Sequence, residues 1–379
     1  MLDRFVRRPA GAALAAACAA LVVVPPAAGS TGVVGGPQLA SRGVLVDYPS
    51  RSVARLPDVK ASAFVVADAG TGQVLAAKDP HGWYQPASTL KMLTAITLIP
   101  LLNPDATVVA SKLAASTVPN VVGLVAGRAY QVSDLFTALL TISANDAAIA
   151  LAQADGSYGM GMAAINAEAR HLQADDTVAV DPNGLTAPGQ HTSAYDLALI
   201  ARQALTMPAF LKYDQTLTAR FVVARHKAVT LYNQNSLLTT YPGALGGKIG
   251  WTSAAGATYV GMARRNGVTL IVTLLHCPAL TEVKSAKSLL NWGFAADGKV
   301  APVGTLVAPL RPAARSPAAS ARPRHRAAVG TRPVDLASGP SALAAAGFSC
   351  AAVVAAALGF AFTRRRGRKA RSGSPRNGV

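Results

Sequence analysis

The order of strand-like and helical segments limits the fold of this chain more than any other feature. Strand-like residues occur near both ends of residues 30–300, and segments with helical spacing occupy the sequence between them. Strands from the two ends can then meet in one sheet while the helices pack against it. The pattern therefore predicts an α+β fold with an antiparallel sheet flanked by helices.

Local composition predicts the individual elements. Residues 61–78 are typical of a hairpin with an Ala-Gly-Thr-Gly turn, and residues 131–152 of two helices around a polar turn. From residue 247 onward we expect two strands, 247–263 and 268–276, joined by the turn Arg-Arg-Asn-Gly. The remaining expected elements are strands within 216–230 and helices at 90–102, 160–172, 193–205 and 283–294.

Both ends of the chain resemble targeting segments. Residues 1–29 have a basic start, an apolar run and then small residues, which is the layout of a secretory signal peptide. Residues 341–362 carry no charge and could span about 30 Å of hydrocarbon as a helix, and the basic tail 363–379 follows directly. A buried Ala-rich helix is the alternative, but it would not need that tail. We expect a single-pass protein of the cell membrane, with a catalytic domain (30–300) outside the cytoplasm, a linker rich in Pro, Ala and Arg (301–340) and a cytoplasmic C-terminus.

The charge of the chain comes mainly from its ends. The formal net charge is +18, but 16 of the 36 basic residues and 2 of the 18 acidic residues lie outside 30–300, which leaves that region at +4. This small excess gives no reason to expect nucleic acid as a partner. Cys277 is alone in the region, so no internal disulfide is expected, and the histidines lack metal-ligand spacing. We therefore expect no metal and no cofactor.

Residues 86–91, Pro-Ala-Ser-Thr-Leu-Lys, offer a nucleophile and a base. Pro86 can open a helix, which would put Ser88 in its first turn and Lys91 on the same face three residues later. A hydroxyl attacks poorly until a base takes its proton, and burial lowers the pKa of a lysine amine toward that task. The pair alone is weakly specific, because S-x-x-K arises by chance about once in a chain of this length.

Two further motifs follow in order, Ser143-Ala-Asn145 in a turn between helices and Lys248-Ile-Gly250 on a strand. Together with segments such as LLTISANDAAIALAQ, INAEARHLQADDTVAVDPNGL and SLLNWGF, they resemble the serine D-alanyl-D-alanine carboxypeptidases, the low-molecular-mass penicillin-binding proteins. The resemblance covers residues 60–294. It implies a β-lactamase or penicillin-binding transpeptidase-like fold with an additional helical subdomain.

The resemblance also implies a role for each matched residue. Ser88 would be the acylated nucleophile, Lys91 its base and Ser143 a proton relay. Asn145 would bind the peptide carbonyl of the substrate, and Lys248 would orient Ser143 and attract the terminal carboxylate. The other substrate-binding positions would be Gly250, Trp251 and Thr252, and the backbone N–H groups of Ser88 and Trp251 would form the oxyanion hole. The substrate would be the peptidoglycan pentapeptide stem, which loses its terminal D-alanine, and β-lactams would trap the same serine.

Ile249 departs from the family pattern, which usually has Thr or Ser at this position to help bind the terminal carboxylate. A hydrogen bond to a charged group is worth about 1.5–3 kcal/mol. One interpretation is an active carboxypeptidase in which Thr252 or Lys284 compensates. Another is a penicillin-binding-like protein that binds wall peptide and barely turns over. A β-lactamase is a third interpretation, but Glu168 is followed by Ala-Arg-His-Leu and does not fit its E-x-x-L-N pattern.

Overall fold

The computed structural model describes residues 32–50 and 53–311. The expected signal peptide, the membrane helix, the basic tail and most of the linker lie outside these residues. Within the described ranges, no helix is both long and apolar enough to cross a bilayer. The described part of the chain is one compact unit.

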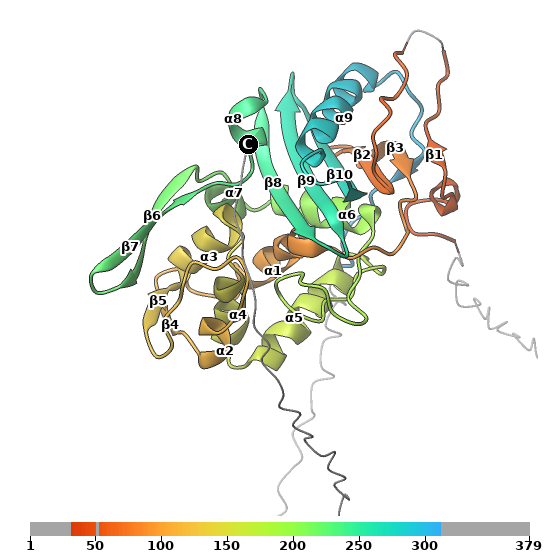
Figure 1. Cartoon of the computed structure of the whole chain (residues 1–379). Coiled ribbons are helices and arrows are strands. Elements are labelled where there is room, and N and C mark those ends of the chain that lie inside the picture. Colours follow the sequence, from red (N-terminus) through yellow and green to blue (C-terminus); the bar gives the residue numbers. More distant parts are fainter. Residues whose placement is uncertain (1–31, 51–52, 312–379) are drawn as a thin grey trace, which may run out of the picture. The chain divides into compact units, whose positions relative to one another are not determined.

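A central antiparallel sheet organises the molecule (Figure 1). Its strands follow the order β1-β3-β2-β10-β9-β8, and β11 pairs with β3. Segments far apart in the sequence thus become neighbours, as in the pairing of Val65 with Thr273. The strands are β1 (Val44–Leu45), β2 (Ala63–Asp68), β3 (Gln73–Lys78), β8 (Ala244–Thr252), β9 (Gly256–Arg265), β10 (Val268–Cys277) and β11 (Gly304–Thr305). The prediction of an antiparallel sheet built from both ends of the domain is confirmed.

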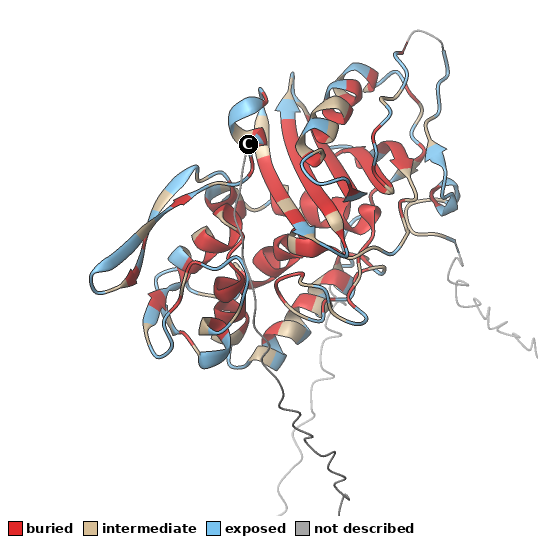
Figure 2. Cartoon of the chain, in the orientation of Figure 1, coloured by how far each residue is buried: buried red, intermediate tan, exposed pale blue. Residues whose placement is uncertain are grey.

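Helices cover both faces of this sheet because its strands bury both sets of alternating side chains. On one face, Phe64 and Val66 of β2 join the core that includes Leu289 of α9 (Glu282–Ala296). On the other face, Val65 joins the larger core formed with α1 (Lys91–Leu98) and α6 (Ala194–Leu205). Figure 2 shows burial continuing along β8, β9 and β10 and into the neighbouring helices.

A helical subdomain contributes to the larger core, and its presence was predicted. It contains α2 (Lys112–Ala115), α3 (Val132–Thr141), α4 (Asn145–Ala154) and α5 (Tyr158–His171), with the short strands β4 (Thr107–Val109) and β5 (Ala129–Gln131). The prediction of two helices around a polar turn within 131–152 is confirmed by α3 and α4. The other elements are α7 (Pro208–Asp214), α8 (Leu237–Thr240), the 3₁₀ turns η1 (Pro37–Ala40) and η2 (Ala87–Leu90), and a projecting hairpin of β6 (Thr218–Ala224) and β7 (Lys227–Tyr232) (Figure 1).

The prediction of a single strand over residues 247–263 is wrong. The chain reverses direction between β8 and β9, which pair with each other. Gly256 adopts a φ of +64°, which glycine accepts readily, and the Thr252 hydroxyl accepts a hydrogen bond from the Ala255 N–H at 3.0 Å. The residues between β8 and β9 are small, as residues in many strands are, so composition alone did not predict the turn.

The folded region also extends beyond residue 300, where the sequence had placed the start of the linker. β11 pairs with β3, and the Val303 N–H donates to the Val74 carbonyl at 2.9 Å. Leu306 is fully buried. This stretch is rich in Pro and Ala, so the sequence did not predict its short strand, β11.

Candidate active site

The first part of the site lies where η2 continues into α1. Ser88 lies in the 3₁₀ turn and Lys91 begins the α-helix, so their side chains share one face. A hydrogen bond of 2.9 Å joins Lys91 Nζ to Ser88 Oγ, and the same amine donates to the Asn183 carbonyl at 2.6 Å. The nucleophile and base predicted from residues 86–91 therefore lie in direct contact.

Burial favours the neutral form of the Lys91 amine, and the neutral form can act as a base. The side chain is fully buried, and burial lowers the pKa of Lys91 well below its ordinary value. The charge on Lys248 lowers the pKa further, and Asp181 opposes the shift. Burial therefore favours the neutral amine, whose lone pair can take the Ser88 proton.

A loop after α5 supplies the carbonyl that holds Lys91. Asp181 Oδ1 accepts hydrogen bonds from the backbone N–H groups of Asn183 and Gly184, each at 2.7 Å. Gly184 has a φ of +82°, and a Cβ there would lie 1.7 Å from the Ala87 carbonyl oxygen. Only glycine allows this close approach between the loop and the turn that carries the nucleophile. Sequence reasoning missed Asp181, although the Asp-Pro-Asn-Gly run was a visible turn signal.

Ser143 and Asn145 lie at the turn between α3 and α4. Ser143 has a φ of +63°, and its Oγ is buried without a hydrogen-bond partner among residues 32–50 and 53–311, as is Asn145 Oδ1. Asn145 Nδ2 donates to the Pro119 carbonyl at 2.5 Å, which leaves its second hydrogen and Oδ1 for a ligand. Because buried polar groups are normally paired, these free atoms suit substrate binding.

A second loop, residues 119–124, supports this turn and was not predicted from the sequence. Asn120 Nδ2 donates to the Ser143 carbonyl at 3.0 Å. The Asp146 carboxylate accepts from the backbone N–H groups of Val122, Gly123 and Leu124 at 2.8–3.0 Å. The carboxylate therefore anchors the loop to α4 beside Ser143 and Asn145.

Lys248 approaches the site from β8. Its side chain is buried, and burial lowers the pKa of Lys248 to about 8 against the opposing charge of Asp214. The resemblance implied a bond from Lys248 to Ser143, but Lys248 Nζ instead donates to the Ile249 carbonyl at 2.8 Å. In the described part of the chain Ser143 Oγ has no partner, so the contact that the resemblance implied between Lys248 and Ser143 is not formed.

Asp214, at the end of α7, is a further residue that sequence reasoning missed. It is buried, and its Oδ2 accepts the Gly247 N–H at 2.6 Å. Burial raises the pKa of Asp214 to about 7, although this hydrogen bond and Lys248 oppose the shift. A Cβ on Gly246 would lie 1.9 Å from Asp214 Oδ2. The two glycines before Lys248, Gly246 and Gly247, were therefore a sequence signal that another segment packs closely against this strand.

The three motifs converge on one cavity of about 290 Å³. Lys91 and Lys248 do not line it, but each buried amine bonds to a lining residue, Lys91 to the Ser88 hydroxyl and Lys248 to the Ile249 carbonyl. Lys284 does not line it either, and Thr252 lies outside it, with its hydroxyl 3.2 Å from that of Thr186. The lining contains no His, Cys, Asp or Glu, so this cavity offers no metal-ligand set. It is lined by Ser88, Pro119, Asn120, Ser143, Asn145, Leu185, Gln234, Ile249, Gly250 and Trp251.

Comparison with known proteins agrees with this geometry. The D-alanyl-D-alanine carboxypeptidase family matches residues 50–278. The chain belongs to this family. It is therefore a serine-type hydrolase of the penicillin-binding class, and the resemblance inferred from its motifs is confirmed.

Individual relatives are also similar. D-alanyl-D-alanine carboxypeptidase DacB2 of Mycobacterium tuberculosis is 37% identical over 257 residues, which are 66% of this chain and 88% of the relative. A crystal structure of a D-alanyl-D-alanine carboxypeptidase from M. tuberculosis H37Rv gives a TM-score of 0.65 at 36% identity, covering 69% of this chain and 99% of that one. The Streptomyces K15 DD-transpeptidase gives a TM-score of 0.60 at 28% identity, covering 63% and 99%. The predicted fold class is confirmed.

Proposed function

We propose that the protein removes the terminal D-alanine from peptidoglycan pentapeptide stems through an acyl-enzyme on Ser88. The observation that carries this proposal is the 2.9 Å contact between Ser88 Oγ and the buried amine of Lys91. Family membership supports the reaction class. The three motifs lining or adjoining one cavity support the assignment of roles.

The reaction begins when the neutral Lys91 amine takes the Ser88 proton and Oγ attacks the carbonyl carbon of the D-Ala-D-Ala bond. The backbone N–H groups of Ser88 and Trp251 stabilise the negative oxygen of the tetrahedral intermediate. The C–N bond then breaks, and the Ser143 hydroxyl passes its proton to the departing amine. Ser143 in turn takes a proton from the Lys91 ammonium group. Water next attacks the ester, with Lys91 again acting as the base, and this step restores the Ser88 hydroxyl.

Lys248 and Asn145 position the substrate. The positive charge of protonated Lys248 attracts the terminal carboxylate of the stem. Ile249, at the neighbouring position, offers no hydroxyl to bind the carboxylate. Asn145 holds the peptide amide with its unused Nδ2 hydrogen and Oδ1. A β-lactam places its strained amide in the same position and leaves a slowly hydrolysed ester on Ser88.

We further propose that the catalytic domain works outside the cytoplasm, anchored by residues 341–362. The support is the sequence pattern of a signal peptide at 1–29 and of an uncharged segment followed by an arginine cluster. Expression of the full chain and of a chain ending at residue 340 tests the anchor. The full chain is expected in the membrane fraction, and the shortened chain in the soluble extracytoplasmic fraction.

Two parallel assays test the chemistry: labelling by a fluorescent penicillin and D-alanine release from diacetyl-L-Lys-D-Ala-D-Ala. The wild type is expected to do both, and Ser88→Ala to do neither. Ser253→Ala is the matched control, since Ser253 is exposed in the β8–β9 turn and is expected to behave as wild type. Labelling without D-alanine release would indicate a peptide-binding protein limited by Ile249, and rapid penicillin hydrolysis would indicate a β-lactamase. Turnover by Ser88→Ala would refute the nucleophile.

A further inference from the structure

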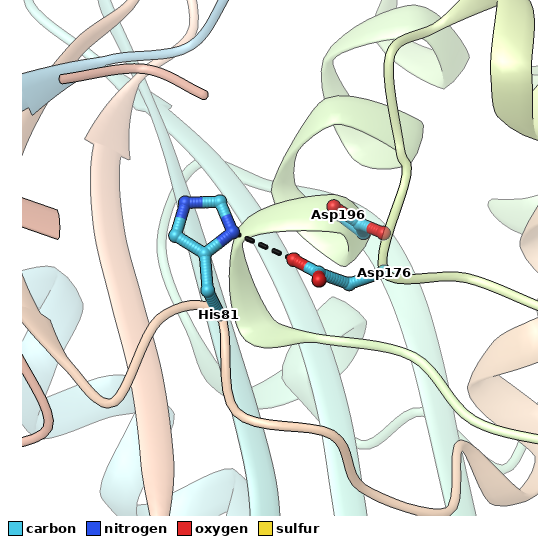
Figure 3. Close-up of side chains that lie close together, drawn as sticks. All are labelled: His81, Asp176 and Asp196. Atoms are coloured by element: carbon cyan, nitrogen blue, oxygen red, sulfur yellow. Dashed lines mark hydrogen bonds and ion pairs between the residues drawn. The ribbon is translucent and has the colours of Figure 1, made fainter. Parts of the chain in front are cut away.

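A second group of chemically active side chains lies outside the catalytic cavity (Figure 3). It consists of His81 in the segment before η2, Asp176 in the loop after α5, and Asp196 on α6. One nitrogen or oxygen atom from each lies within 4.8 Å of the other two. Figure 3 shows the imidazole facing the Asp176 carboxylate, with Asp196 beside it. The catalytic mechanism uses none of these residues.

The hydrogen bonds of His81 determine which nitrogen faces the carboxylates. Nε2 lies 3.0 Å from the Val34 carbonyl oxygen, which only accepts, so Nε2 carries a hydrogen. Nδ1 lies 2.6 Å from Asp176 Oδ2. In a neutral imidazole, Nδ1 would then point a lone pair at a carboxylate. At this distance a proton lies between the two atoms, and a metal ion would take the place of that proton only as the pair opened. A backbone carbonyl on the distal N–H is the arrangement that metal-binding histidines commonly have.

The carboxylates have little other positive charge near them. Asp196 is almost fully buried, and within residues 32–50 and 53–311 the only ion pair of either carboxylate is that of Asp176 with His81. Neutral donors contact both carboxylates: Trp83 Nε1 bonds to Asp176 at 2.9 Å, and Thr177 Oγ1 bonds to Asp196 at 2.7 Å. The Ser193 hydroxyl interacts with both. Two carboxylates and one imidazole, oriented by neutral donors, form a ligand set that a divalent cation would neutralise.

We propose that His81 Nδ1, Asp176 and Asp196 bind one Zn²⁺ ion. Nitrogen and oxygen ligands suit zinc, and three protein ligands leave a fourth position for water. Tetrahedral zinc ligands lie roughly 3.3 Å apart. The His81–Asp176 pair therefore opens by less than 1 Å on binding, and Asp196 moves closer.

The position of this zinc site links it to the catalytic centre. His81 precedes Ser88 by seven residues, and Asp176 precedes Asn183, whose carbonyl binds Lys91, by the same number. The Val34 carbonyl on the distal nitrogen of His81 adds the N-terminal segment to the same assembly. Zinc binding would therefore fasten the two segments that hold the nucleophile and its base. The ligands are 95 and 20 residues apart in the sequence, which explains why no motif spacing indicated a site.

Titration of the full-length protein tests the proposal. After chelation and desalting, ZnCl₂ is added while bound metal, melting temperature and tryptophan emission are followed, since Trp83 bonds directly to Asp176. We expect one Zn²⁺ per chain and, at about 100-fold excess over Kd, a melting temperature raised by about 5 °C. His81→Ala and Asp176→Asn are each expected to weaken binding about 100-fold or more.

His191→Ala is the matched control, because this imidazole stacks on Trp83 at 4.2 Å but is not in the cluster. It is expected to bind zinc as the wild type does. Lack of Zn²⁺ binding by the wild type would overturn the proposal and leave a proton-linked ion pair. Binding that persists in both folded ligand variants would place the metal elsewhere and would equally overturn it. The readout is independent of catalysis, so failure of the proposed reaction would not affect it.

Discussion

Replacing Gly250 by alanine tests how closely β8 must approach the nucleophile. A Cβ at this position would lie 2.4 Å from Thr258 Oγ1, 2.7 Å from the Ser88 backbone nitrogen and 3.0 Å from that of Thr89. Two of these neighbours are backbone atoms, so no rotamer change relieves the contacts. Restoring ordinary van der Waals contact of 3.4 Å to Ser88 N requires a displacement of about 0.7 Å between strand and turn.

That displacement would alter both the proposed oxyanion hole and the contact between Ser88 and Lys91. A misplacement near 1 Å costs about 100-fold in rate, and we expect acylation of Gly250→Ala by a fluorescent penicillin to be slower by about that factor. Stopped-flow labelling gives the second-order rate constant, and thermal unfolding checks that the variant is folded. Gly159→Ala is the control, because Gly159 lies in helix α5 without close contacts. A folded Gly250→Ala that acylates within threefold of wild type would show that acylation does not depend on this close approach.

Three further predictions follow from single contacts. In a plot of kcat/KM against pH, activity is expected to fall at about pH 8, where Lys248 loses its charge. Asp214→Asn should move this alkaline limb to lower pH, because the Asp214 carboxylate raises the pKa of Lys248. An unmoved limb would contradict the assignment. Ile249→Thr restores a hydroxyl and should raise kcat/KM for the peptide about tenfold or more, and an unchanged value would show that the carboxylate is held elsewhere. Asp146→Ala should lower the free energy of unfolding by about 3 kcal/mol, since three backbone donors lose a charged acceptor. A loss below 1 kcal/mol in denaturant titration would contradict that role.

Sequence reasoning identified the residues whose chemistry depends on local spacing. Ser88 and Lys91 are one helical turn apart, so their contact followed from the helix itself. The hairpin of β2 and β3 was likewise recognisable, because its turn residues and strand residues differ clearly in type. Family resemblance, rather than spacing, connected the motifs at Ser143 and Lys248 to the site of Ser88.

The residues that were missed act across long sequence distances. Asp214 reaches β8 through a contact with Gly247, and Asp146 holds a loop that has no regular pattern of its own. His81 and Asp176 meet only because the sheet and helices bring their loops together. The turn before Gly256 was missed for a local reason, since its small residues also suit a strand. Such features depend on tertiary packing, which periodicity and composition do not report.

Peptide mapping of the penicillin adduct identifies the nucleophile of the protein. After brief incubation with benzylpenicillin, the protein is digested and the modified peptide is sequenced by mass spectrometry. The account predicts one penicilloyl group per chain, attached to Ser88, and no adduct in Lys91→Ala under the same conditions. A penicilloyl group on any other residue, or none on a folded wild-type protein, would contradict it.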